Sequence, residues 1–148
     1  MAAKPETTFY RGVLDRLPRT LHHEKMANPY RGGTFDSWFS GKRDLWVEWK
    51  YIELPKRDTT VFDLCTPRGG NMTSPLSALQ QEWGHARHVE GRNVWVIVGC
   101  SVGRGAQGLI FDKPSDWKRK WLVSELRSEL LSRDSIAGCI EDFTIGQA

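Results

Sequence analysis

The chain has 148 residues, a length typical of one domain, and folding can bury roughly 70% of the unfolded chain's surface at this size. Hydrophobic residues make up 39%, and no apolar run approaches the ~18 residues that a membrane-spanning helix needs. Residues 1–11 lack a secretory pattern, and Cys65, Cys100 and Cys139 form no CxxC pair, which argues against a disulfide framework or a zinc–thiolate site. We therefore expect a cytoplasmic protein with no membrane partner. A net charge of +3 does not by itself indicate nucleic acid.

The first third of the chain predicts a helix followed by three strands. Residues 6–17 carry apolar side chains near helical spacing and stop before a proline, which predicts an amphipathic helix. Residues 21–26 predict a strand. Residues 34–40 and 44–52 are rich in aromatic and β-branched side chains, and the intervening residues 41–43 predict a hairpin loop.

The remainder of the chain predicts a helix between two strands. Residues 52–75 form a long polar interruption, after which residues 77–90 place Leu79, Trp83 and Ala86 on one apolar helix face. Residues 94–98 are continuously apolar, as in a strand buried on both faces. A strand–helix–strand succession predicts a right-handed parallel crossover.

Further predictions complete the α/β domain, which we assign to the whole chain. We expect a core at about residues 6–111, with a short strand at 108–111. A C-terminal helical extension should cover about residues 115–148, beginning with one helix over 115–131. The central sheet should be mixed and flanked by helices.

Strand alternation divides the hairpin into two faces. The apolar face carries Phe35, Phe39, Leu45, Val47, Trp49 and Tyr51. The other face carries Asp36, Trp38, Asp44, Trp46, Glu48 and Lys50. If Ser40 pairs with Asp44, the register places Asp36 opposite Glu48, and two facing carboxylates destabilise a sheet unless something compensates for them. A divalent cation such as Mg²⁺ would do so, and Lys50 beside it could orient water or neutralise phosphate charge.

These residues resemble the D…ExK signature of the PD-(D/E)XK nuclease superfamily, with Asp36 followed by Glu48-Trp49-Lys50. The tracts at residues 22–30, 33–41 and 76–80 are also similar to small phage-encoded nucleases of the Holliday-junction resolvase and VRR-type branches. The sequence departs from the superfamily pattern at Phe35, which stands in place of the proline that gives the superfamily its name.

The resemblance implies an αβββαβ core and a DNA endonuclease that depends on Mg²⁺ or Mn²⁺, acting on duplex or branched DNA. It implies that Asp36, Glu48 and the backbone carbonyl of Trp49 hold the metal, while Lys50 positions the attacking water. Gln80 would touch the same site from the following helix. An additional acidic ligand would come from Glu24 or, alternatively, from Glu6, and the sequence leaves that choice open.

Several neighbouring residues have competing interpretations. Asp44 is a rival metal ligand, although an aspartate beside a loop is commonly only solvated. His22-His23 and the pair His85 and His88 lack a third ligand at zinc spacing and are better explained as surface histidines. The tryptophans at 38 and 46 could stack on exposed bases or simply pack.

Loops near the proposed site carry cations that could follow a phosphate backbone. They are Lys25, Arg31, Lys42, Arg43, Lys56, Arg57 and Arg68. A homodimer would be the simplest way to cut both strands of a junction. The alternatives are a nuclease-like fold that binds nucleic acid or inhibits a host factor without cleavage, and a hydrolase of RNA or nucleotides.

Overall fold

The computed structural model describes residues 4–26, 32–67, 74–102 and 105–146. Its helices are α1 (Pro5–Leu14), α2 (Ala78–Val89), α3 (Pro114–Trp117), α4 (Val123–Ser128) and α5 (Arg133–Thr144). Its strands are β1 (His22–Lys25), β2 (Ser37–Ser40), β3 (Asp44–Ile52), β4 (Val61–Phe62), β5 (Val94–Val102), β6 (Gly105–Phe111), β7 (Trp121–Leu122) and β8 (Leu131–Ser132). No helix within these ranges is both long and apolar enough to span a membrane.

A six-stranded mixed sheet in the order β1-β2-β3-β5-β6-β8 forms the centre of the molecule. Strands β3 and β5 pair in parallel, and the other neighbours pair antiparallel. Helix α2 lies between the two strands of the parallel pair in the chain, which confirms that a parallel crossover is present. The predicted hairpin register is also confirmed, because Ser40 pairs with Asp44 and Trp38 with Trp46.

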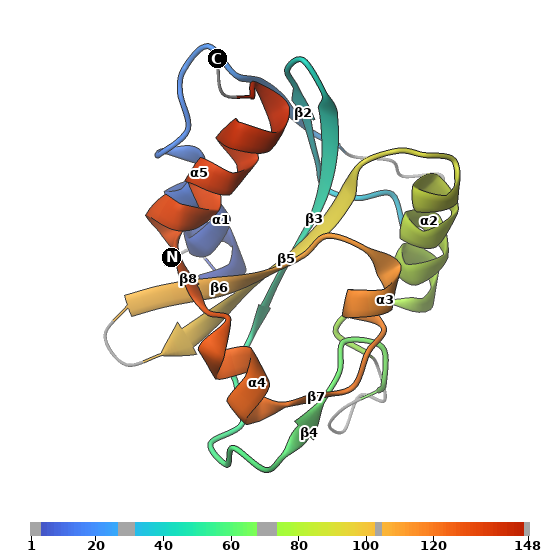
Figure 1. Ribbon diagram of the computed structural model, residues 1–148, viewed down its shortest axis with the longest axis vertical. Helices are drawn as coiled ribbons and strands as arrows, with labels where there is room; N and C mark the ends of the chain where they lie inside the picture. The colour runs from blue at the N-terminus through green and yellow to red at the C-terminus, as the bar shows by residue number, and fades with distance from the viewer. Residues whose placement is uncertain (1–3, 27–31, 68–73, 103–104, 147–148) are drawn as a thin grey trace.

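Helices cover both faces of this sheet (Figure 1). Helices α1 and α5 lie together against one face, and α2 and α3 lie on the other. The side chains of β5 alternate between these layers: Val96 and Val98 are buried toward α3, and Trp95 and Ile97 are buried toward α1 and α5. The prediction of a strand buried on both faces is therefore confirmed, and the chain has the expected mixed α/β architecture.

Two glycines allow α1 to lie close to the sheet. Gly99 of β5 and Gly108 of β6 are direct partners across the sheet. A Cβ at Gly99 would lie 2.6 Å from Phe9 Cγ, and one at Gly108 would lie 2.7 Å from Phe9 Cζ. Both distances are too short for a real Cβ contact, so the paired glycines leave the space that the buried Phe9 ring occupies.

The side-chain alternation predicted for the first hairpin strand is wrong before Ser37. Strand β2 begins at Ser37 rather than at residue 34, and Phe35 lies on the α2 side of the sheet, opposite to the predicted face. The centroid of its ring lies 4.9 Å from that of Trp83 and 6.2 Å from that of Trp117. A Cβ on Gly84 would lie 2.5 Å from Phe35 Cζ, so this glycine of α2 makes the close approach possible.

The single helix predicted for residues 115–131 is also wrong. The segment forms α3, β7, α4 and β8 in succession. Residues 121 and 122 pair with β4, which lies inside the long interruption at 52–75, and this tertiary pairing interrupts the helix. Helix α5 then supplies a larger share of the α1-side core than the sequence indicated, through Ile136 and Ile140.

Candidate active site

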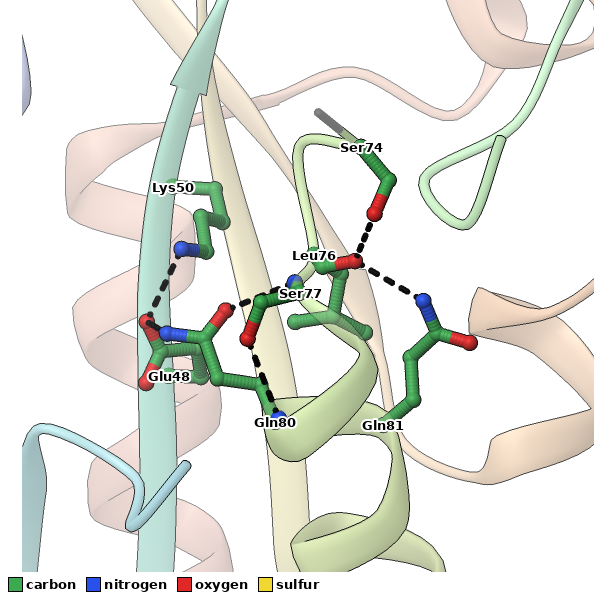
Figure 2. Close-up of polar contacts among 7 residues, drawn as sticks. All are labelled: Glu48, Lys50, Ser74, Leu76, Ser77, Gln80 and Gln81. Atoms are coloured by element: carbon green, nitrogen blue, oxygen red, sulfur yellow. Dashed lines mark hydrogen bonds and ion pairs between the residues drawn. The ribbon is translucent and has the colours of Figure 1, made fainter. Parts of the chain in front are cut away.

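Glu48 lies in the middle of β3 and is the buried acid of the candidate site. Its side chain is only 2% exposed and points toward α2. Figure 2 shows Gln80 and Lys50 converging on it: Gln80 Nε2 donates a hydrogen bond to Glu48 Oε2 at 3.0 Å, and Lys50 Nζ lies 3.3 Å from the same oxygen. The other oxygen, Oε1, is buried and has no hydrogen-bond partner among the described residues.

The first turn of α2 fixes the side chain of Gln80. Ser77 is the N-cap: its hydroxyl accepts from the Gln80 amide at 3.2 Å, and Gln80 Oε1 accepts from the Ser77 amide at 3.0 Å. This reciprocal capping box leaves Gln80 Nε2 free to donate to Glu48 (Figure 2). The pattern Ser-x-x-Gln is visible in the sequence, and it could have identified the residue that holds Gln80 in place.

The segment before α2 is itself tied to the fold. The Leu76 amide donates to the Leu64 carbonyl at 2.8 Å, and the Leu76 carbonyl accepts from Ser74 Oγ and from Gln81 Nε2 (Figure 2). The Leu76 side chain is fully buried. The helix therefore starts at a fixed point beside β3. Gln80 follows Glu48 by 32 positions in the sequence, so the contact between them depends on this fixed start.

Burial and the nearby charge of Asp36 raise the pKa of Glu48 to about 8, although Lys50 opposes the shift. Asp36 is one residue short of β2, so the predicted cross-strand pair with Glu48 does not belong to the ladder, which ends at Ser37 and Val47. The carboxylate of Asp36 is nevertheless close enough to disfavour ionisation of Glu48. A bound cation would relieve the repulsion between the carboxylates of Asp36 and Glu48.

The backbone carbonyl of Trp49 faces the side of β3 where Asp36 lies. The Trp46 amide donates toward β5, to the Asn93 carbonyl at 2.9 Å. Peptide groups alternate along a strand, so those of Glu48 and Lys50 also face β5, while that of Trp49 faces the side of β2. On that side the ladder has already ended at Ser37, next to Asp36.

Two carboxylates and one carbonyl are a donor set of oxygen atoms that fits Mg²⁺ or Mn²⁺. Within the described ranges, no cluster of three or more His, Cys, Asp or Glu side chains is arranged for a metal. Mg²⁺ does not require one, because it is typically held by one or two carboxylates with water and phosphate oxygens completing its coordination. The unpartnered Glu48 Oε1 is an acceptor of the kind that such an ion would use.

The two candidates for an additional acid are separated by the structure. Glu24, in β1, has a side chain that is 53% exposed, pairs with His22 Nε2 at 3.3 Å, and lies opposite Trp38. Glu6, in α1, is partly buried, and its pKa is raised by that burial and by the charge of Asp36, while Lys50 lowers it. Glu6 is therefore within electrostatic range of Asp36 and Lys50, whereas the Glu24 carboxylate is exposed and pairs with His22.

The predicted nucleic-acid-binding cations are distributed over several places. Lys25 donates to the Tyr10 hydroxyl at 3.3 Å, and its charge also lowers the pKa of Glu6. Lys42 and Arg43 are exposed in the β2–β3 turn, and Arg43 lies roughly 16 Å from Glu48 at 3.3 Å per residue. Arg31 and Arg68 lie outside the described residues.

The rival ligands for a metal are not brought together. Asp44 is exposed at the start of β3, four residues before Glu48, which corresponds to roughly 13 Å. His85 and His88 are exposed on α2, and the His85 ring contacts Lys118 Nζ at 3.1 Å. His22 and Glu24 pair with each other instead.

Comparison with known proteins supports the fold alone. No protein-family model matches the chain, and no curated protein matches it in sequence. A solved structure that is similar is Hjc of Archaeoglobus fulgidus, described as a Holliday junction resolvase from an archaeal hyperthermophile. The match covers 91% of this chain and 97% of that chain, with a TM-score of 0.50 and 16% sequence identity. The chain therefore has the fold of an archaeal Holliday junction resolvase, as the sequence resemblance implied.

Proposed function

We propose that this protein is a metal-dependent DNA endonuclease that hydrolyses phosphodiester bonds. The observation that carries the proposal is the environment of Glu48: a buried carboxylate with one unpartnered oxygen, a lysine ammonium at 3.3 Å and a second acid close enough to raise its pKa. A structural ion pair has no need of the second acid, whereas cation-assisted phosphoryl chemistry uses all three groups.

Each side chain has a proposed role. Asp36, Glu48 and the Trp49 carbonyl would hold Mg²⁺ or Mn²⁺, which supplies polarisation of the scissile phosphate and a lowered pKa of the attacking water. Lys50 orients that water and neutralises charge that develops on the phosphate. Gln80 is a positioning residue, because its amide holds the Glu48 carboxylate in one orientation. Glu6 is the proposed additional acid, because it lies within electrostatic range of Asp36 and Lys50.

The substrate we propose is branched DNA. The support is the likeness in fold to a protein described as a Holliday junction resolvase, over nearly the full length of both chains. Cutting two strands of a junction symmetrically requires two active sites, so we also propose a homodimer on the DNA. The predicted contacts of Lys25, Arg31, Lys42, Arg43 and Arg68 with phosphates remain part of this proposal.

The test is a cleavage assay with a four-way junction, linear duplex, single-stranded DNA, supercoiled plasmid and RNA, each with Mg²⁺, Mn²⁺ or EDTA. We expect cutting of the junction that requires metal and is lost in Glu48→Gln and Lys50→Ala. Glu141→Gln and Lys113→Ala are matched controls, because both side chains are exposed and belong to α5 and to the N-terminus of α3. The controls should retain activity.

Two other outcomes would reject the proposal. Absence of cleavage of every substrate, with tight DNA binding retained in Glu48→Gln, would identify a binding module. Cleavage of RNA alone would identify a ribonuclease. Calorimetry gives an independent check of the metal site: if Asp36→Asn binds Mg²⁺ and Mn²⁺ as well as the parent protein does, the assigned ligands are wrong.

A further inference from the structure

A second feature lies on the same face of the sheet as Glu48: an open groove between the β2–β3 hairpin and α2. Its volume is about 480 Å³, within the range of roughly 300–1,000 Å³ that small-molecule ligand sites occupy. The residues that line it are Trp38, Asp44, Trp46, Trp83, Arg87, Glu90 and Arg92. The groove is therefore walled by three tryptophans and two arginines.

The tryptophans form a continuous aromatic surface. The Trp38 and Trp46 rings stack at 29° with centroids 6.2 Å apart, and Trp83 meets Trp46 edge-on at 5.6 Å. All three are half-buried, so each keeps part of its surface accessible. Side chains that serve only as core are usually more completely covered, as Trp49 and Trp117 are here.

The groove continues directly from the candidate active site. On β3, Trp46 is two residues from Glu48 and shares its face, which is a distance of roughly 7 Å. On α2, Trp83 lies one turn beyond Gln80. The candidate catalytic residues and the aromatic surface therefore lie on adjacent stretches of β3 and α2. The separation of Glu48 and Trp46 corresponds to about two nucleotide steps at 3.4 Å each.

Cations border the aromatic surface. Arg87 Nη2 pairs with Glu90 at 2.9 Å, and its guanidinium lies 5.6 Å from the Trp83 ring centroid, so that pair is internally neutral. Arg92 is exposed and makes no ion pair with any described residue. A smaller hollow of about 280 Å³ continues the groove and adds Lys42 beside Arg92. Asp44 is the opposing carboxylate, which leaves a net positive rim.

We propose that this groove binds unpaired nucleotides of the DNA substrate, with bases stacked on the tryptophans and phosphates near Arg92 and Lys42. The proposal rests on the proposed nuclease function and adds a substrate feature to it: an unpaired segment next to the scissile phosphate. A base inside a duplex is already stacked on its neighbours, so only an unpaired base can offer its face to the indole rings.

Binding measured without catalysis tests this proposal separately from the nuclease activity. The Glu48→Gln protein in EDTA is titrated into a labelled forked duplex with short unpaired arms and into a blunt duplex of the same sequence. We expect tighter binding of the fork, with quenching of tryptophan fluorescence. On this background, Trp46→Leu and Arg92→Glu should each weaken fork binding by about fivefold or more and change blunt-duplex binding much less.

Controls separate the groove from general effects on folding and charge. Trp121→Leu removes a half-buried tryptophan outside the groove, and Arg19→Glu reverses an exposed charge between α1 and β1. On the same Glu48→Gln background, both should bind the fork as tightly as the Glu48→Gln protein itself does. If Trp46→Leu fails to fold by circular dichroism, the exposed Arg92→Glu still decides the question. Equal affinity for fork and blunt duplex in the parent, or unchanged fork affinity in Arg92→Glu, overturns the proposal.

Discussion

Replacing Glu48 by glutamine should change the pH dependence of stability in the metal-free protein. The folded state raises the pKa of Glu48 from 4.5 to about 8, mainly by burial and then by the charge of Asp36. The folded protein therefore binds one proton more than the unfolded chain between these two values. Stability from this group is fully present below the unfolded pKa and is lost as pH rises toward the folded pKa.

The size of the effect follows from proton linkage. One proton bound only in the folded state changes the free energy of unfolding by about 1.4 kcal/mol per pH unit. From about pH 5.5 to about pH 7.5 the parent protein should therefore lose roughly 2 to 3 kcal/mol relative to Glu48→Gln. Glutamine has the same shape, can still accept from Gln80, and cannot ionise. The side chain is 2% exposed, so solvent screens the effect little.

Urea unfolding followed by fluorescence across this pH range, in EDTA, gives the difference between the two proteins. Glu141→Gln is the control, because that glutamate is exposed on α5. Thermal unfolding offers a second measurement, with an expected difference of roughly 5 to 10 °C for a chain of this length. Adding Mg²⁺ near neutral pH should stabilise the parent and leave Glu48→Gln nearly unchanged, since ligands stabilise the state that binds them.

The reasoning would be refuted by parallel stability curves for the parent and Glu48→Gln between these pH values. That result would mean that Glu48 ionises normally in the folded protein, through full compensation by Lys50. A curve for the parent that rises with pH relative to the variant would reverse the sign and assign Glu48 to a stabilising ion pair instead.

The remaining predictions concern the helix that carries Gln80. Gly84→Ala should lower the free energy of unfolding in urea by about 1 to 2 kcal/mol despite the better helix propensity of alanine, because the new Cβ meets the buried Phe35 ring at 2.5 Å. Gly138→Ala on α5 is the control and should be neutral or stabilising, because a Cβ there has nothing within 4 Å. Similar results at both sites would contradict the packing of Gly84 against Phe35. Ser77→Ala should cost about 1 kcal/mol and also reduce the cleavage rate, since it releases Gln80. Ser132→Ala, the N-cap of α5, should cost about as much without affecting the rate, and an equal loss of rate in both would reject the positioning role.

The candidate site was largely predictable because its residues are close in sequence. The hairpin loop at residues 41–43 fixes the register, and the period of two then sorts side chains onto faces. This placed Glu48 and Lys50 together correctly. The same rule failed at Phe35, because alternation holds only inside a strand and β2 begins two residues later.

Contacts between segments distant in the sequence were predicted less well. The helix predicted for residues 115–131 has suitable local periodicity, yet residues 121 and 122 pair with β4, about sixty positions earlier. Leu79 occupies a position on the predicted apolar face of α2 and is 56% exposed. In both cases a tertiary partner, or the lack of one, outweighed a weak local preference.

The sequence by itself determined the order of the main elements, the parallel crossover and the pair Glu48 and Lys50, because hydrophobic period and turn chemistry are local properties. Only the tertiary structure distinguished the surroundings of Glu6 from those of Glu24, showed which Glu48 oxygen Gln80 contacts, and joined three tryptophans into one groove. Those outcomes depend on how α1 and α2 pack across the sheet. Packing is settled by shape and burial over the whole chain, which no short segment encodes.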